Sequence, residues 1–244
     1  MMWHVGTVIA LHDETATART IGLQVPGWPG HIAGQHTDVR LTAPDGYSAV
    51  RSYSIASAPS SNGRIELTVE RLSDGEVSPY LTEQLAVDDR LELRGPIGGW
   101  FVWRPRQTEP VQLIAGGSGV VPLMAMIRSR ASAASAAPFR LLYSVREPGA
   151  VFYRDELRAI SDHDDSVLIT YAYTRAVPKS WPRSAGRIDA DLIANTTWPS
   201  HLTPTCYVCG PTSFVESVSV LLLACGNKPD KIRTERFGPT GGRQ

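Results

Sequence analysis

The sequence predicts a two-domain protein, an antiparallel β-barrel followed by an α/β domain with a parallel, Rossmann-like sheet. Its 244 residues suffice for two domains of about 100–150 residues each. Short runs that alternate apolar and polar side chains fill the first hundred residues, whereas longer apolar runs separated by helical stretches fill the rest. A linker rich in Pro and Arg at 104–110 separates the two patterns. We therefore place the domains at residues 1–105 and 106–244.

Alternating strands of the first domain are expected at 39–41, 65–69 and 91–93. Turn signals separate them, and short antiparallel strands at this spacing are typical of a closed barrel or a sandwich. One helix is expected near 78–85, with Ser78 as its N-cap and Pro79 at its first position.

Four continuous apolar or β-rich runs predict the parallel strands of the second domain, at 111–115, 139–144, 167–173 and 207–209. Helices are expected between or after them, at 122–130, 151–160 and 212–224. Strands that alternate with helices in this way give a parallel sheet with helices on both faces.

The composition excludes several classes of protein. No apolar run approaches the roughly 20 residues that span a bilayer. Basic and acidic residues number 24 each, so a nucleic-acid partner held by bulk charge is not expected. Three Cys residues cannot form a disulfide scaffold and suit a reducing compartment. We expect a cytoplasmic protein that contacts neither membrane nor nucleic acid.

A glycine-rich segment at 116–122 follows an apolar strand and begins a helix. Glycines there allow backbone N–H groups to approach a pyrophosphate at the positive end of the helix dipole. The dipole contributes only about 0.3–1 kcal/mol, so amides and Arg side chains must supply the rest. The same pattern also fits a tight strand-to-helix turn that binds nothing.

In the first domain, residues 51–54 place an Arg, an aromatic ring and a hydroxyl close together on one strand. Such side chains can pair with a phosphate, stack on a planar ring and donate to a ring nitrogen. A strand with an exposed Arg and a Tyr at the edge of the core explains the segment equally simply.

Four segments, in this order, resemble the signature motifs of the ferredoxin–NADP reductase family of flavin oxidoreductases, and the resemblance covers nearly the whole chain. They are the flavin motif Arg51-Ser52-Tyr53-Ser54, the pyrophosphate turn Gly75-Glu76-Val77-Ser78, the pyridine-nucleotide loop Gly117-Ser118-Gly119-Val120-Val121-Pro122 and the signature Cys209-Gly210-Pro211. The tail Glu235-Arg236-Phe237 fits as well. The resemblance implies a flavin-binding barrel followed by a pyridine-nucleotide domain.

The resemblance also implies roles for the flavin residues. Arg51 would pair with the flavin phosphate through its fork, and Tyr53 would lie against the flavin ring. Ser54 would bond the flavin N5 edge, where the hydride arrives. Ser52 belongs to the same motif. The turn residues Gly75, Val77 and Ser78 would hold the pyrophosphate, which implies FAD rather than FMN.

In the second domain, the resemblance assigns the dinucleotide to Gly117, Gly119 and Pro122. Cys209, followed by Gly210 and Pro211, would lie near the nicotinamide C4 atom. Glu235 and Phe237 would close the site near the flavin. The expected catalytic residues are Ser54, Cys209 and Glu235.

Three Arg residues bear on the choice between NADPH and NADH. Arg146, Arg175 and Arg187 fall in the segments where the family discriminates the two nucleotides, and Thr174 precedes Arg175. Arg is suited to grip the 2′-phosphate of NADP, so we expect NADPH ahead of NADH. Alternatively, these are surface residues among 21 Arg, and Glu147 could bind a ribose diol.

Cysteine and histidine patterns predict no metal site. Cys206 and Cys209 have C-x-x-C spacing but straddle the end of an apolar strand, so we reject a redox or zinc pair and expect Cys206 and Cys225 in the core. All six His are expected in loops or at the surface. The 244 residues contain no Cys-x4-Cys-x2-Cys run of a plant-type [2Fe–2S] domain.

The expected function follows from the resemblance and that missing run. A hydride would pass from NAD(P)H to FAD, and electrons would leave singly to a separate ferredoxin, flavodoxin or oxygenase component. Two alternatives stay open, a reductase of small acceptors such as free flavin, quinone or oxygen, and a non-catalytic FAD-binding regulatory subunit.

Overall fold

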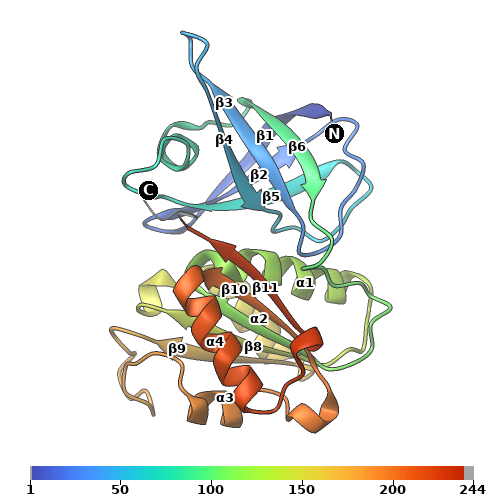
Figure 1. The fold of residues 1–244 in the computed structure, drawn as a ribbon. Coiled ribbons are helices and arrows are strands. Elements are labelled where there is room, and N and C mark those ends of the chain that lie inside the picture. The colour runs from blue at the N-terminus through green and yellow to red at the C-terminus, as the bar shows by residue number, and fades with distance from the viewer. Residues whose placement is uncertain (1, 239–244) are drawn as a thin grey trace, which may run out of the picture. The chain divides into compact units, whose positions relative to one another are not determined.

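A computed structural model describes residues 2–238 of the chain (Figure 1). The chain divides into two compact units. The first runs to Pro105 and includes Met124–Ala133, and the second consists of Arg106–Leu123 and the residues from Ala134 onward. No helix among the described residues is both long and apolar enough to cross a membrane.

The first unit is built on an antiparallel sheet, which confirms the predicted class. Its strands are β1 (Trp3–Thr15), β2 (Ala18–Gln24), β3 (His36–Thr42), β4 (Ser48–Ser54), β5 (Arg64–Glu70) and β6 (Arg90–Ile97). They pair in the order β4-β3-β6-β1-β2-β5, with every pairing antiparallel. An antiparallel bridge between Ile55, directly after β4, and Leu67 of β5 joins the two ends of this order. The sheet therefore curls into a barrel.

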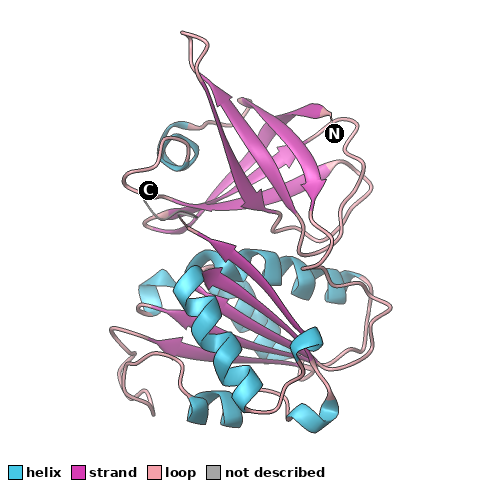
Figure 2. Cartoon of the chain, viewed as in Figure 1, coloured by secondary structure: helices cyan, strands magenta, loops and turns pink. Residues whose placement is uncertain are grey.

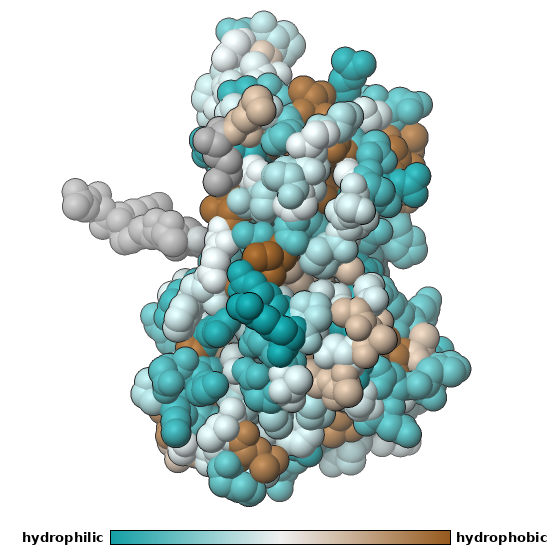
Figure 3. All heavy atoms as spheres, turned by 90° about the vertical axis from the view of Figure 1, so that its right-hand side faces the viewer, coloured by the Kyte–Doolittle hydropathy of each residue, from teal (hydrophilic) through white to brown (hydrophobic). Residues whose placement is uncertain are grey.

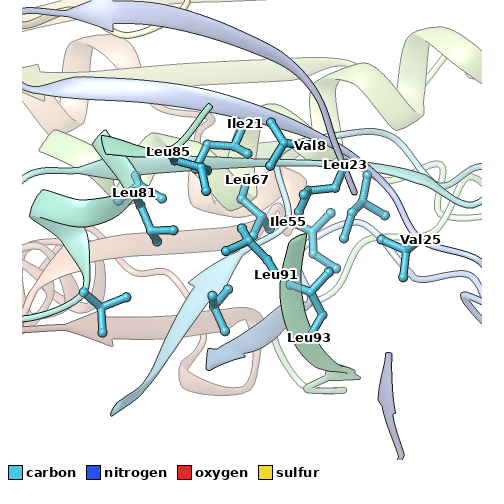
Figure 4. Packing of buried hydrophobic residues seen from close by; sticks show 14 of the residues in the cluster. Val8, Ile21, Leu23, Val25, Ile55, Leu67, Leu81, Leu85, Leu91 and Leu93 are labelled. Atoms are coloured by element: carbon cyan, nitrogen blue, oxygen red, sulfur yellow. The ribbon is translucent and has the colours of Figure 1, made fainter. Parts of the chain in front are cut away.

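Alternation along the strands fills the barrel with aliphatic side chains (Figure 4). On β6, Leu91 and Leu93 are buried, whereas Glu92 between them lies outside and pairs with Arg40 at 2.7 Å. Leu81 and Leu85 enter the same core from the connection between β5 and β6. Full burial of each such side chain contributes about 1.5–3 kcal/mol.

The short helix of this connection differs from the sequence prediction. It is a π-helical turn, η1 (Tyr80–Gln84), whose N-cap is Pro79 without a side-chain cap bond. The prediction that Ser78 is the N-cap was wrong, because the Ser78 hydroxyl accepts a 3.0 Å hydrogen bond from the Leu72 amide in the preceding turn instead. The Ser78 carbonyl oxygen instead accepts a bond from the Thr82 hydroxyl at 2.8 Å.

The second unit is built on a parallel sheet, again as predicted. Its strands are β7 (Val111–Gly116), β8 (Phe139–Val145), β9 (Val167–Tyr173), β10 (Thr205–Pro211) and β11 (Ile232–Phe237), in the order β11-β10-β7-β8-β9. The helices that follow β7 in the chain are α1 (Val120–Ser132), most of which groups with the first unit, α2 (Arg154–His163), α3 (Ala190–Thr196) and α4 (Thr212–Ala224). Single turns are η2 (Gly117–Gly119), η3 (Pro148–Ala150), η4 (Ser200–Leu202) and η5 (Pro229–Lys231).

Helices α3 and α4 lie on one face of this sheet and α2 on the other (Figure 2). Ile114 and Val208 from the strands pack against Val215 and Leu222 of α4 in one buried cluster. Because central strands are covered on both faces, their sequences read as continuous apolar runs.

Two helices differ from the predictions. Helix α2 begins at Arg154 rather than 151, because Tyr153 adopts a left-handed conformation with φ of +55°. Helix α3 was not predicted. It is only seven residues long, and the Asp189 carboxylate caps it by accepting from the Leu192 amide at 2.8 Å.

His31 lies in the loop between β2 and β3, as expected. Its ring is buried, with Nε2 lying 3.1 Å from the Ser57 carbonyl oxygen, and burial lowers its pKa. His36 lies on β3 and is half-buried rather than in a loop.

On the face shown in Figure 3, apolar side chains form separate patches among hydrophilic residues. The exposed large apolar residues include Trp100 and Val220, at 59% and 65% exposure. Isolated exposures of this kind are normal and mark no site by themselves.

Candidate functional site

Arg51 of the flavin motif lies midway along β4 with an exposed guanidinium. Its Nη1 donates to the Val50 carbonyl at 2.8 Å, and its Nη2 donates to the Glu76 carboxylate at 3.0 Å. Glu76 belongs to the turn 75–78, so this ion pair brings the flavin motif and the predicted pyrophosphate turn together.

Ser52 points away from Arg51, toward β3. Its hydroxyl donates to Asp38 at 2.6 Å, and Arg94 of β6 donates to the other carboxylate oxygen at 2.7 Å. Burial alone would raise the pKa of Asp38, but the bonds from Ser52 and Arg94 outweigh it and hold that pKa below its usual value. Asp38 ties the flavin motif to two neighbouring strands, a role that no local sequence signal indicated.

Tyr53 and Ser54 end β4. The Tyr53 ring packs partly against the barrel core, and burial raises its pKa to about 12, so the phenol stays neutral. Ser54 lies opposite His36 in the register of β3 and β4 and is half-buried. A half-buried ring and a hydroxyl at the strand end suit contact with a planar cofactor.

The turn 75–78 offers unused backbone donors. The Gly75 amide bonds the Leu72 carbonyl at 3.0 Å, and a Cβ at Gly75 would lie only 2.8 Å from the Ser78 oxygen. Within residues 2–238, no hydrogen bond engages the amides of Glu76 or Val77. Two open amides in the turn whose Glu76 side chain pairs with Arg51 fit a phosphate-bearing cofactor such as FAD.

The glycine loop runs from the end of β7 through η2 into α1. Gly117 has a φ of +56°, which favours glycine. A Cβ at Gly119 would lie 2.2 Å from the Cys209 carbonyl oxygen, so only glycine permits this approach. Pro122 is buried in the first turn of α1. The structure thus brings the predicted nucleotide loop against the Cys209-Gly210-Pro211 segment of β10.

Phe214, a residue that sequence reasoning missed, reinforces this junction. A Cβ on Gly116 or on Gly210 would lie 2.8 or 2.7 Å from the Phe214 ring. The two glycines, at the adjacent ends of β7 and β10, let the ring of α4 lie directly on the backbone. Paired glycines followed by an aromatic residue in the next helix were the available signal.

Cys209 and Glu235 face each other in the register of β10 and β11. Burial, and secondarily the Glu235 charge, raises the pKa of the Cys209 thiol well above its ordinary value. Burial also raises the pKa of Glu235 to about 7. The thiol is therefore neutral and unreactive, whereas the carboxyl group can hold or release a proton near neutral pH.

Phe237, which was expected to close the site near the flavin, lies at the end of the described chain. Phe237, the last residue of β11, pairs with Pro211 and is 37% exposed. The glycine-rich residues 239–244 lie outside the part of the chain that the structure describes.

Backbone bonds gather the three Arg-bearing segments at the carboxyl ends of β8 and β9. The amide of Arg175 bonds the Arg146 carbonyl at 2.9 Å, and the Thr174 amide bonds the Val145 carbonyl at 2.9 Å. The Gly186 amide, next to Arg187, bonds the Tyr173 carbonyl at 2.9 Å. Within the described chain, no carboxylate pairs with the exposed Arg146, Arg175 or Arg187.

A pocket of about 350 Å³ opens elsewhere, between α2 and β9. Arg158, Tyr171 and Tyr173 line it, and the two Tyr rings stack with centroids 6.0 Å apart. None of the predicted cofactor-binding residues lines this pocket, although its lining residue Tyr173 directly precedes Thr174 and Arg175.

The other cysteines behave as core residues. Cys206 is buried, its thiol donates to the Asn227 side-chain oxygen at 3.7 Å, and burial raises its pKa to about 12. Cys225 is half-buried and free. Among residues 2–238, no group of three or more His, Cys, Asp or Glu side chains could hold a metal ion.

Comparisons with known proteins identify a known domain in each part of the chain. An oxidoreductase FAD-binding domain model matches residues 16–102, and an oxidoreductase NAD-binding domain model matches residues 113–220. Ferredoxin–NADP reductase B of Sorangium cellulosum is 32% identical over 210 residues, which cover 84% of each chain.

A second relative is the ferredoxin–NAD(P)⁺ reductase component of the naphthalene 1,2-dioxygenase/salicylate 5-hydroxylase systems of a Ralstonia species. It is 25% identical over 236 residues, 97% of this chain and 69% of that protein. Among solved structures, the flavohem-like FAD/NAD-binding domain of nitric oxide dioxygenase from Vibrio cholerae has the same fold. The TM-score is 0.85 at 23% identity, covering 97% of this chain and 99% of that one.

The two matching domain models, in the order barrel then parallel sheet, account for both cofactors, FAD and NAD(P). With the Sorangium cellulosum relative, they establish that the chain belongs to the ferredoxin–NADP reductase family of FAD-dependent NAD(P)H oxidoreductases.

Proposed function

We propose that this oxidoreductase uses NADPH in preference to NADH and passes electrons one at a time to a separate ferredoxin, flavodoxin or oxygenase component. The observation that carries the nucleotide preference is the cluster of Arg146, Arg175 and Arg187 at the carboxyl ends of β8 and β9. Guanidinium groups without a carboxylate partner are suited to bind the 2′-phosphate that distinguishes NADPH. The Thr174 hydroxyl adds a donor beside them.

The residues take the following roles in this proposal. Arg51 and the open amides of the turn 75–78 hold the flavin phosphates, while Tyr53 supports the flavin ring. Gly117, Gly119 and Pro122 shape the loop that receives the dinucleotide. Ser54 bonds the flavin N5 edge, the neutral Cys209 thiol shapes the pocket for the nicotinamide, and Glu235 can hold a proton near neutral pH. Residues 1–105 form the flavin domain and residues 106–244 the nucleotide domain.

When bound, FAD accepts two electrons with a hydride and can release them one at a time, which nicotinamide cannot do. The 244 residues contain no cysteine run for a plant-type cluster, so this proposal assigns the one-electron carrier to a component outside them. The name of the Ralstonia relative supports this assignment, because that protein is a reductase component of oxygenase systems.

The acceptor is tested by following NADPH oxidation with purified ferredoxins, flavodoxins, free flavin or quinone as the added acceptor. The proposal expects two molecules of one-electron carrier reduced per NADPH oxidised, at rates above those with free flavin or quinone. Rapid turnover with free flavin or quinone while all protein carriers stay oxidised would identify a reductase of small acceptors instead.

A further inference from the structure

The acidic side chain of Glu76 forms an ion pair with Arg51, the residue that we assign to the flavin phosphates. The Glu76 carboxylate accepts from Arg51 Nη2 at 3.0 Å and from the Tyr47 hydroxyl at 3.3 and 3.4 Å. Tyr47 belongs to the hairpin between β3 and β4, and Glu76 to the turn after β5. Three separate segments therefore converge on one carboxylate at the surface, where the Arg51 and Glu76 side chains are 52% and 54% exposed.

The geometry of the guanidinium makes Glu76 relevant to any phosphate bound there. Arg has five N–H donors, and Arg51 uses one on Val50 and one on Glu76. Both two-nitrogen edges of a guanidinium include Nη2, the atom that Glu76 holds. A phosphate gripped by the fork of Arg51 therefore comes close to the Glu76 carboxylate, and like charges repel.

The backbone of Glu76 adds to this conflict. Its amide is one of the two open donors of the turn 75–78. A negative side chain thus belongs to the same residue that offers an N–H to an anion. By contrast, Gln has the same size and would keep the backbone donor without the charge.

We propose that Glu76 is an internal anionic competitor for Arg51, which weakens the binding of the flavin phosphates and thereby sets the affinity for FAD. This inference rests on the proposed role of Arg51. The opposite effect would follow if Glu76 and Tyr47 acted as a clamp that holds Arg51 ready for the phosphate. The two roles differ in the sign of the effect that Glu76→Gln has on FAD affinity.

The test compares the dissociation constants of FAD and riboflavin for the full chain after removal of its flavin, by flavin fluorescence. Exposed ion pairs are weak, so Glu76→Gln is expected to tighten FAD binding by about two- to fivefold. Riboflavin lacks phosphates, so it should bind the original protein and the Glu76→Gln variant equally. The matched control is Glu83→Gln, which removes the exposed carboxylate paired with Arg71 in the same unit and should leave FAD affinity unchanged.

A double-mutant cycle with Arg51→Gln separates this inference from the function on which it rests. Arg51→Gln should weaken FAD binding, and Glu76→Gln should then no longer tighten it. Arg51→Gln could weaken FAD binding while Glu76→Gln has no effect or weakens it too. In that case the competitor role of Glu76 is wrong, whereas the proposed role of Arg51 in binding the flavin phosphates stands. Equal tightening of riboflavin would also overturn the competitor role. If Arg51→Gln leaves FAD affinity unchanged, both assignments fail.

Discussion

The structure alters the ionisation of Glu235 near neutral pH. Burial raises its pKa from 4.5 to about 7, so between these values the folded chain holds a proton that the unfolded chain has lost. The free energy of unfolding should therefore fall as pH rises through this window, by up to about 1.4 kcal/mol per pH unit. Glu235→Gln should remove this contribution, as measured by urea unfolding at pH 5 and pH 7.5.

The exposed Glu216 of α4 provides the control for that measurement. Glu216→Gln should keep the pH dependence of the original protein. If Glu235→Gln and the original protein lose stability equally between the two pH values, the Glu235 carboxyl group is not the one that titrates.

Arg175 provides the residue-scale test of nucleotide choice. A charge-assisted hydrogen bond contributes about 1.5–3 kcal/mol, so Arg175→Ala should raise the KM for NADPH roughly 10- to 100-fold. The KM for NADH should stay nearly constant. Steady-state kinetics with both nucleotides measures the difference. Arg183→Ala is the control, because Asp189 already engages that guanidinium. If Arg175→Ala raises the KM for NADPH and the KM for NADH equally, Arg175 has a structural role and does not select the nucleotide.

At the residue scale, the sequence indicated motif members but not their partners. Arg51 and Gly119 stood out because their residue types and local neighbours are informative. Glu76 and Asp38 did not, since each contacts a residue on a different segment of the chain. Such contacts depend on strand register, which no local pattern specifies.

Among the elements, the junction of the glycine loop with β10 is the most constrained. Gly119→Ala places a Cβ 2.2 Å from the Cys209 carbonyl oxygen, so the loop and the strand must separate. Overpacking of this kind costs about 1–3 kcal/mol. We expect a lower melting temperature and at least a tenfold loss of kcat/KM for NADPH, with the flavin content retained.

Thermal unfolding and flavin absorbance check this prediction. Gly149→Ala in η3 is the matched control, because a Cβ there meets no atom within 4 Å. A Gly119→Ala protein with unchanged turnover would show that the close approach to Cys209 does not shape the nucleotide site.

Elements with a clear period were predictable, and elements with local distortions were not. The boundaries 167–173 and 212–224 agree with β9 and α4. The first strand was not foreseen, because β1 carries register shifts between Val8 and Ala10 and between Asp13 and Thr15 that break its alternation. Ser78 was mistaken for a cap because its competing partner, the Leu72 amide, lies upstream of the helix.

At the scale of the whole molecule, the change of hydrophobic period sufficed to predict an antiparallel barrel or sandwich followed by a parallel sheet, and the family resemblance pointed to the barrel. Neither could predict that Met124–Ala133 of α1 groups with the first unit. There the Arg128 guanidinium donates to the Ala56 carbonyl at 3.0 Å and to Glu66 at 2.9 Å. These partners lie 72 and 62 residues away, beyond the reach of any pattern within one helix.

The central claim, transfer of electrons from NADPH to bound FAD, is tested most directly by anaerobic titration of the purified protein. The visible flavin band is followed while NADPH, and in a parallel sample NADH, is added. We expect one equivalent of NADPH to bleach the band, with a higher concentration of NADH needed for the same effect. A flavin band that neither nucleotide bleaches would contradict the account and favour a non-catalytic flavin-binding protein.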